Sequence, residues 1–385
     1  MRKTGFFIII FLLAFAAFSL TVSADERETE SLTAAEEAEI REEWETFRDS
    51  IPPEVQELLP DGFFSAEFAD VETGVAEASA PAAILSAVSK LFFSSFTKAL
   101  SLLARLCGIL VLGAVLTQLG GGNSGVREAF SFCCALAMTL MIFSGSALSL
   151  SDISAYFKTI GGICSAFLPM MGVLYAMGGN IGTAVANQGV FSAFLVILET
   201  VCASSVVPIA VICIALALLS SVGEELSLRS LSNLIKRTFT VGLSFLMLLL
   251  CGVLGVQTTL AKASDTLAMR TARFAAGSFL PVVGGSVAET LRTVSAGVGY
   301  LRGVTGTAGI VVLFFAFLPM FLSVLLARLA FLLAGAFAGM LSATREEKLL
   351  AEFASVYGYF LAVIASLFVM TVFSLTLFAS CATAL

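Results

Sequence analysis

The sequence predicts an all-α, polytopic helical membrane protein with about seven spans, interfacial amphipathic helices and a short exported acidic N-terminal segment. Of its 385 residues, 58% are hydrophobic and 13% are charged, whereas about half and about a quarter are usual in soluble proteins. Apolar runs recur from residue 99 onward, and about 20 such residues cross a hydrocarbon core of roughly 30 Å. The runs lack the period-2 alternation of barrel strands, so helices are expected to satisfy the backbone.

The first 24 residues have the features of a signal peptide. A basic start precedes an apolar run over residues 6–22, and small residues at 22–24 suit a cleavage site. Cleavage before Asp25 is expected. An uncleaved anchor is the alternative, because the apolar run is nearly long enough to span a bilayer.

Residues 25–83 are expected to form the exported acidic segment. Residues 25–90 hold 18 acidic and 4 basic side chains, whereas residues 91–385 hold 10 acidic and 15 basic ones. A short amphipathic helix around Trp44 is expected to stop at Pro52-Pro53. The segment is too small and polar to hold a large core alone, which favours a docking arm or linker over an enzyme domain. No basic patch suggests nucleic acid as a partner.

Residues 84–385 are expected to form the multi-span membrane domain. An amphipathic helix over 84–103 is expected to lie on the membrane surface before the first span. The expected spans cover residues 103–119, 129–150, 160–178, 190–222, 238–258, 308–341 and 353–380. The fourth is too long for one straight span and contains Glu199 and Pro208, so two segments are expected to meet near 204–208 as a tight hairpin or a broken helix.

Residues 223–237 predict an amphipathic helix in the membrane interface. Ser221 and Glu224 make a capping box at its start, and two basic residues end its last turn. The positive-inside rule places this helix on the cytoplasmic side, where it is a candidate docking site for a partner. A solvated loop helix is the alternative. The candidate docking residues are Glu224, Glu225, Arg229, Lys236 and Arg237.

The stretch TARFAAGSFLPVVGGSVAET, residues 271–290, predicts a re-entrant or interfacial hairpin over 274–290. Its apolar part of about ten residues is too short to cross a bilayer. The proline and paired glycines would then lie at a turn buried in protein or lining a water-filled path. A glycine-rich surface loop is the alternative.

Charged residues inside a membrane usually face the protein interior, so two carboxylates become candidates for a pathway. Glu199 lies inside a span and Glu289 follows the double glycine. For Glu199, a helix–helix hydrogen bond is the competing interpretation. The candidate pathway or packing residues are Glu199, Pro208, Pro281, Gly284, Gly285 and Glu289.

The residue inventory argues against an enzyme. The sequence has no histidine, which removes His-containing zinc motifs and Ser-His triads. Its eight cysteines lie in apolar runs without a C-x-x-C pattern and are expected to be buried small residues. Asp152 and Asp265, the pair that an intramembrane aspartyl protease would need, are expected in polar loops. With no phosphate loop, ATP would have to be used by another subunit, and we expect no cofactor or metal.

The residues from SSVGEELSLRSLSNLIKR (220–237) through TARFAAGSFLPVVGG (271–285) resemble the stage III sporulation protein AE family of endospore-forming bacteria. The resemblance implies a non-enzymatic membrane subunit of a channel or secretion-like complex linking mother cell and forespore. It implies a location in the mother-cell membrane around the forespore and no catalytic residues. It also implies partners from the same operon, among them a cytoplasmic ATPase and ring-forming proteins between the membranes. The alternative function is a stand-alone small-molecule permease.

Overall fold

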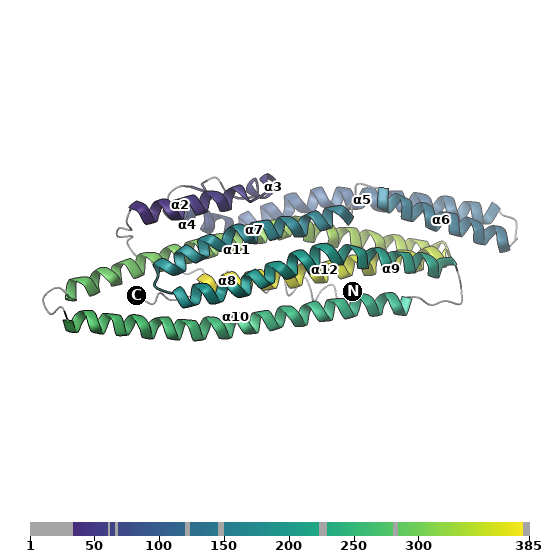
Figure 1. Ribbon diagram of the computed structural model, residues 1–385. Coiled ribbons are helices and arrows are strands. Elements are labelled where there is room, and N and C mark those ends of the chain that lie inside the picture. The colour runs from purple at the N-terminus through teal and green to yellow at the C-terminus, as the bar shows by residue number, and fades with distance from the viewer. Residues whose placement is uncertain are drawn as a thin grey trace.

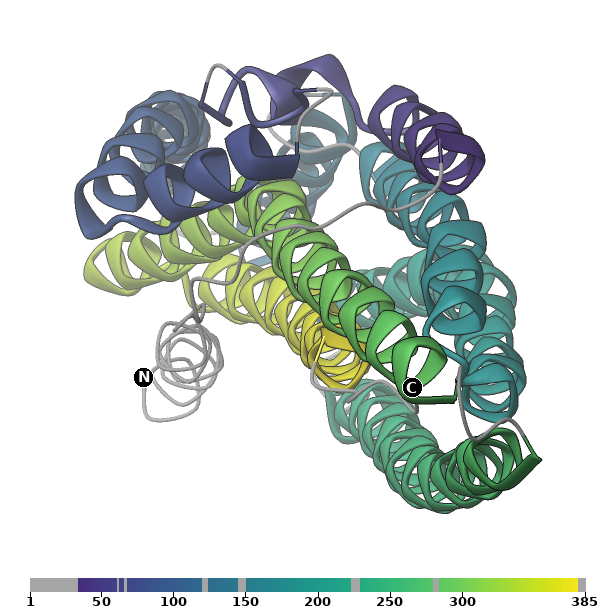
Figure 2. The same cartoon turned by 90° about the vertical axis from the view of Figure 1, so that its left-hand side faces the viewer.

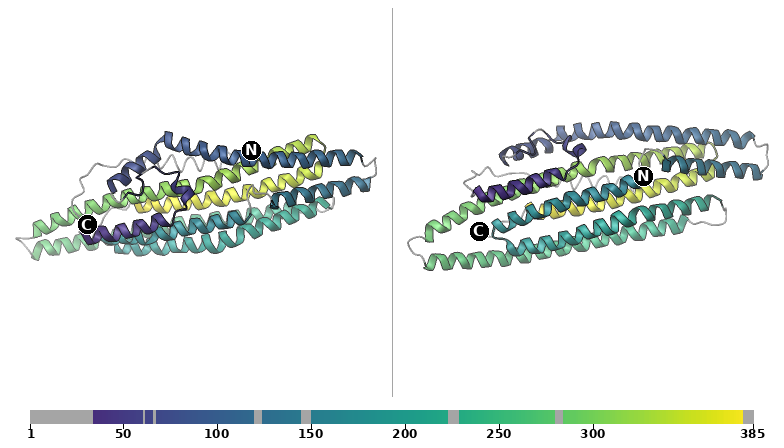
Figure 3. Two further views of the ribbon diagram at one scale, coloured as in Figure 1. Left: turned by 90° about the horizontal axis from the view of Figure 1, so that it is seen from above. Right: turned by 45° about the horizontal axis from the view of Figure 1, so that its top comes forward.

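The computed structural model describes residues 34–60, 62–65, 68–119, 124–144, 150–222, 229–279 and 284–379, and every element in these ranges is a helix. They are α2 (Ala34–Asp49), α3 (Pro53–Gln56), α4 (Phe68–Ser79), α5 (Pro81–Leu119), α6 (Ser124–Ser144), α7 (Leu150–Met177), α8 (Ile181–Val196), the π-helix η1 (Ile197–Ala203), α9 (Ser204–Val222), α10 (Arg229–Phe279), α11 (Gly284–Met340) and α12 (Thr344–Ala379). The long helices lie side by side along one axis and form an elongated bundle (Figure 1, Figure 3).

Among the described residues, six helices are long and apolar enough to cross a membrane. They cover Pro81–Gln118, Ser151–Met177, Gly182–Leu219, Ser230–Ala268, Val298–Met340 and Thr344–Phe378. The all-α, multi-span prediction is therefore confirmed. The number is one below the expected seven because the shorter helix α6 is followed by α7 in the same direction, so the second and third expected spans lie end to end (Figure 1).

Helices α11 and α12 form the centre of the bundle (Figure 2). In the apolar window of α11, 78% of the residues are buried, against 17% in that of α10. Aromatic side chains fill the contact between the two central helices: the ring centroids of Phe317 and Phe368 are 5.3 Å apart, a typical separation for packed aromatic pairs. The outer helix α10 instead exposes large apolar side chains such as Phe245 and Leu248. This is the pattern of a helix with one face on protein and the other on lipid.

Glycines allow close approach of helices where a neighbouring side chain needs the space. A Cβ atom at Gly309 of α11 would lie 2.9 Å from the Phe167 ring of α7. A Cβ atom at Gly358 of α12 would lie 2.9 Å from the guanidinium carbon of Arg328 on α11. Both contacts are closer than a side chain tolerates, so these positions require glycine for helix packing.

Two helices expected to be separate interfacial elements are parts of longer helices. Residues 84–103 continue without a break into the expected first span, as α5, and residues 229–237 are the first turns of α10. Residues 223–228 lie outside the described residues. Helix α5 also contacts the bundle through a polar residue: Ser95 shares a hydrogen bond of 3.1 Å with Ser323 of α11. Periodicity shows that a face is polar, but it does not show what covers that face.

The interruption expected within residues 190–222 is a π-helix, not a tight hairpin. Helices α8, η1 and α9 follow one another along a single path (Figure 1). Pro208 lacks the N–H group that would bond the Ser204 carbonyl, and a proline ring crowds the preceding turn. The π-helix η1 ends directly before this turn. Ser154 of α7 donates a hydrogen bond of 3.1 Å to the Ala203 carbonyl, which satisfies a backbone acceptor at this irregular point.

The short apolar piece expected as a hairpin over 274–290 is not a separate element. Its first half is the end of α10, which runs to Phe279, and its second half is the start of α11 at Gly284. Pro281 and the rest of residues 280–283 lie outside the described residues. The placement of this junction in or beside a membrane stays a prediction.

The described part of the acidic N-terminal segment packs on the bundle (Figure 2). Helix α2 ends at Asp49, before the two prolines that the sequence marks as its stop. Its Phe47 ring is buried and meets the Phe167 ring of α7 edge-on, with centroids 5.1 Å apart. Further along, the Tyr300 hydroxyl of α11 donates a hydrogen bond to the Glu72 carboxylate of α4. Aromatic burial and this hydrogen bond therefore attach the segment to α7 and α11.

Candidate functional site

The residues predicted to be functional do not gather in one place. The candidate docking residues lie at the start of α10, and the predicted hairpin lies at the other end of this 51-residue helix, about 76 Å away at 1.5 Å per residue, whereas Glu199 and Pro208 lie within the η1–α9 stretch. Gly284, Gly285 and Glu289 belong to the first turns of α11, and Glu199 lies in η1, with the carboxylate side chains outside the described part. Glu224 and Glu225 also fall outside the described residues, and Arg229 begins α10.

Lys236 is buried and paired, which argues against the predicted role in docking a partner. Its Nζ atom lies 3.0 Å from Glu352 Oε2 and donates a 2.7 Å hydrogen bond to Ser355 Oγ, both on α12. Ser232 adds a hydrogen bond to the same carboxylate at 3.3 Å. Both charged side chains are 6% exposed, so no partner reaches the ammonium group while α12 is in place. Arg237, the next residue, is exposed.

The sequence interpretation missed Glu352, although a signal was present. It is the last acidic residue of the chain and lies at the start of a long apolar run. A carboxylate inside a membrane protein needs a cation or several hydrogen-bond donors. A buried ammonium group needs a carboxylate or several hydrogen-bond acceptors. The two residues are 116 positions apart, and no local pattern relates them.

A second buried polar cluster joins α7, α8 and α10. The Asn187 side-chain amide of α8 donates to the Tyr175 hydroxyl of α7, and its carbonyl oxygen accepts a 2.6 Å hydrogen bond from Thr258 of α10. All three side chains are buried. The two hydrogen bonds offset much of the cost of burying the amide, and they hold the three helices in one register.

Arg302 of α11 lies next to this cluster and is completely buried. Its guanidinium carbon lies 5.0 Å from the centre of the Tyr175 ring, and Nη2 donates to the Leu174 carbonyl at 3.4 Å. A Cβ atom at Gly178 would lie 2.3 Å from Nη2. The cation is thus held by a ring face, a carbonyl and the space that a glycine provides.

Asp265 is inside helix α10, not in the polar loop that the sequence suggested. Its carboxylate accepts hydrogen bonds from the backbone N–H groups of Gly182 and Thr183 at 3.1 and 2.9 Å. These are free donors at the N-terminus of α8, so Asp265 caps a neighbouring helix and meets its positive dipole end. This structural role explains the carboxylate without a protease pair.

The polar clusters mark two levels along the buried face of α10. From Lys236 to Thr258 the helix advances 22 residues, about 33 Å, close to the thickness of a hydrocarbon core. Between them this face carries the buried apolar side chains Leu243, Met247 and Leu254. Paired or hydrogen-bonded groups near both membrane edges suit anchoring of helices. Among the described residues, no three acidic or thiol side chains gather as a metal site would require.

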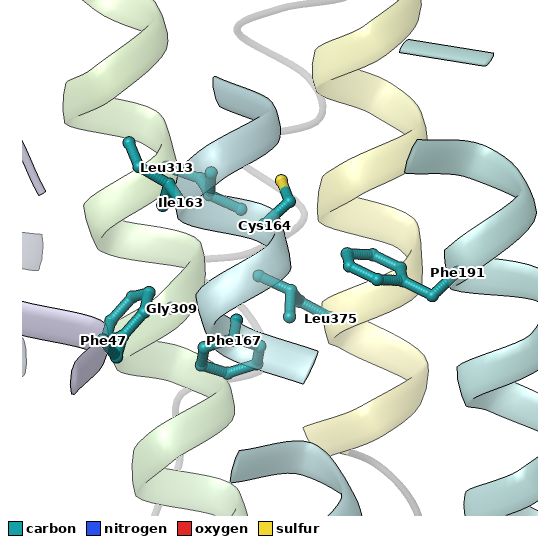
Figure 4. A pocket seen from close by; sticks show the side chains of 8 residues that line it. All are labelled: Phe47, Ile163, Cys164, Phe167, Phe191, Gly309, Leu313 and Leu375. Atoms are coloured by element: carbon teal, nitrogen blue, oxygen red, sulfur yellow. The ribbon is translucent and has the colours of Figure 1, made fainter. Parts of the chain in front are cut away.

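An apolar pocket lies where α2 meets the bundle (Figure 4). It is too narrow to hold a water molecule and is lined by Phe47, Ile163, Cys164, Phe167, Phe191, Gly309, Leu313 and Leu375. The ring of Phe47 approaches Gly309 of α11 and Phe167 of α7 from the acidic segment (Figure 4). The lining offers no polar group to orient a substrate, so the pocket fits a packing contact of the segment.

Comparison with known proteins identifies relatives for most of this chain. The sequence profile of the family described as "Stage III sporulation protein AE" matches residues 64–382. The protein named "Stage III sporulation protein AE" from Bacillus subtilis (strain 168) is 25% identical over 159 residues, which is 40% of each of the two chains. No solved structure matches.

Proposed function

Because the chain belongs to the stage III sporulation protein AE family, we propose that it is a non-enzymatic membrane subunit of the sporulation channel or secretion-like complex linking mother cell and forespore. The family match and the six apolar helices make it a multi-pass membrane protein of sporulation. The proposal adds a role in holding other subunits of that complex.

The arrangement of the buried polar groups favours a subunit of a complex over a self-sufficient permease. Lys236 pairs with Glu352, and Asn187 has both ends of its amide bonded. Leu243, Met247 and Leu254 separate these clusters along α10. Such groups connect helices, and the buried side chains that α10 places between the two levels are apolar. The largely exposed apolar face of α10 leaves room for lipid or for other subunits.

The direction of the helices supports a consistent topology for this role. The α10–α11 junction lies at one end of the bundle, and the N-terminal segment packs along the half nearest to it, whereas the α9–α10 and α11–α12 junctions lie at the other end (Figure 1). We propose that the first end is exported, after cleavage of the signal peptide 1–24, and meets the ring-forming proteins. The second end then faces the mother-cell cytoplasm and the ATPase, with Arg237 exposed there.

Reconstitution separates the subunit from the permease. The purified protein in liposomes is expected to show no solute flux by itself and to co-purify with ring and ATPase proteins of its operon. Charge reversal at Arg237 should weaken the ATPase contact, whereas reversal at Lys262, toward the other end of α10, should not. Solute flux by the protein alone, without partners, would favour the permease.

One observation favours the permease as a second candidate. Glu199 lies in a π-helix at the middle of a span, and π-helical turns are frequent at functional sites. If the carboxylate lines a path, Glu199→Leu should lower sporulation efficiency strongly. Glu199→Gln keeps the shape of the side chain but removes its charge, and it serves as the matched variant. Wild-type sporulation of Glu199→Leu would assign this residue to helix packing.

A further inference from the structure

A polar cavity lies at the end of the bundle where α5, α6 and the α11–α12 turn meet. It has a volume of about 290 Å³. Small residues of α5, including Gly113 and Ala114, form one wall, and Glu128 and Ser131 of α6 form another. Residues 341–346 close it from the third side. None of the helix contacts described above uses this cavity.

The turn between α11 and α12 gives the cavity a rigid wall. Ser342 has φ of 58°, a left-handed conformation that ends α11. The N–H of Ala343 then bonds back to the Ala338 carbonyl at 3.0 Å. This is the six-to-one bond of a helix C-cap, which fixes the direction of the chain into α12. The cavity is therefore preformed by backbone geometry.

A buried carboxylate without a cation lines this cavity. Glu346 is 5% exposed, and its Oε1 atom accepts a 2.7 Å hydrogen bond from Ser131 Oγ. It stands in the first turn of α12, where the helix dipole favours negative charge. No lysine or arginine of the described residues lies within ion-pair distance of it: Arg345 instead approaches Glu128, at 3.7 Å.

We propose that this cavity binds a basic side chain, lysine or arginine, of a partner polypeptide. Among the described side chains that line the cavity, two are carboxylates, Glu128 and Glu346, and one is a guanidinium group, Arg345, so a further cation would balance their charge. The volume is that of about ten water molecules at about 30 Å³ each, far more than one inorganic ion fills but suited to a side chain with its polar head. A buried carboxylate gains more from a cation than from a neutral hydroxyl. The inference does not depend on the proposed function.

The reactivity of a cysteine introduced into the cavity of the full-length protein tests whether the cavity prefers cations to anions. Thr117 lines the cavity, whereas Thr97 is an exposed threonine of the same helix outside it. Thr117→Cys and Thr97→Cys are labelled in detergent with cationic aminoethyl and anionic sulfonatoethyl methanethiosulfonate, and the sites are resolved by peptide mass spectrometry. The cation-to-anion rate ratio is expected to be about tenfold higher at position 117, reflecting the nearby carboxylates.

The ratio at position 117 should fall to that at position 97 when Glu346→Gln is added. Glu128→Gln, at the mouth of the cavity, serves as a second variant should Glu346→Gln impair folding. Lysine amide or arginine amide should protect position 117 from labelling at equal ionic strength, and NaCl or KCl should not. Equal ratios at the two positions, or protection by the salts alone, would overturn the proposal.

Discussion

Three charged side chains at helix contacts of this bundle meet groups from other helices. Lys236 has Glu352 and Ser355, Asp265 has the N-terminus of α8, and Arg302 has a tyrosine ring and a carbonyl. Removing one member of such a set leaves a charge in a medium that cannot solvate it. The stability of the bundle therefore depends more on whether each charged side chain keeps its partners than on the number of charged side chains.

The buried ion pair gives the first prediction. Glu352→Ala should lower the free energy of unfolding by about 3–5 kcal/mol, because the Lys236 ammonium stays buried without its partner. Replacing both residues, Lys236→Met with Glu352→Leu, should recover most of this loss. The matched control Arg237→Ala, at an exposed site, should stay within about 0.5 kcal/mol. Denaturant unfolding in detergent measures all three, and equal losses for the single variants would contradict the burial of the pair.

The second prediction compares two glycines of one helix. Gly309→Ala should destabilise the protein by about 1–3 kcal/mol, because its Cβ would lie 2.9 Å from the Phe167 ring. Gly303→Ala, where no atom lies within 4 Å of the new Cβ, should be neutral or stabilising by up to about 1 kcal/mol. Thermal unfolding checks the order of the two variants. The reverse order would show that α7 and α11 are not in close contact at Gly309.

Helices α2 and α10 each have one face that packs on protein and another face that points outward. Helix α2 is rich in charge but places Trp44 and Phe47 against the bundle. Helix α10 combines a lipid-type outer face with an inner face that has polar ends. In both, the residues that face protein recur with helical period, which is why each is one continuous helix. The acidic segment is attached mainly through such a face.

The attachment of α2 gives the third prediction. Phe47 is 1% exposed, so Phe47→Ala should remove most of the apolar contact of α2 with α7. Trypsin cleavage after Arg48 should then become about ten times faster or more, because the segment opens locally more often. Phe93→Ala, at a phenylalanine of α5 that is 67% exposed, is the control and should leave the rate unchanged. An unchanged rate for Phe47→Ala would contradict the packing of α2.

At the scale of the whole molecule, four of the six long crossings lie between the N-terminal segment and the α10–α11 junction, an even number that returns the chain to the same half of the bundle (Figure 1). Helix α6 does not add a crossing of its own, because α7 continues in its direction. The helices are also longer than a bilayer is thick: α11, with 57 residues, would reach about 85 Å. Parts of the bundle must therefore extend beyond the hydrocarbon core.

Cysteine accessibility tests this topology as the fourth prediction. Exposed positions are available for this test: Glu57 in the N-terminal segment, Thr271 near the α10–α11 junction, and Ser230 and Lys348 near the opposite end of the bundle. In a background without Cys133, the cysteine variants at positions 57 and 271 should react with an impermeant maleimide from the same side of the membrane. Those at positions 230 and 348 should react only from the opposite side. Labelling of positions 57 and 271 from different sides would contradict the arrangement of the helices.

Local signals in the sequence account for much of the fold. The stop of α2 before two prolines and the broken helix near Pro208 follow from what proline does to a backbone. The boundaries of α5 and α10 do not follow from local signals. An amphipathic pattern is the same whether lipid, water or another helix covers the polar face. For this reason the sequence predicts separate surface helices over 84–103 and 223–237, whereas residues 84–103 and 229–237 are parts of long helices.

The sequence by itself determined that this is an all-α, multi-span membrane protein, because composition and the length of apolar runs depend only on neighbouring residues. Only the tertiary structure decided which polar residues meet. Glu352 reaches Lys236 across 116 positions, Asp265 caps a helix that begins more than 80 residues earlier, and Ser131 meets Glu346 across 215. These contacts arise from how long helices align side by side, and the spacing of residues within one helix carries no information about that alignment.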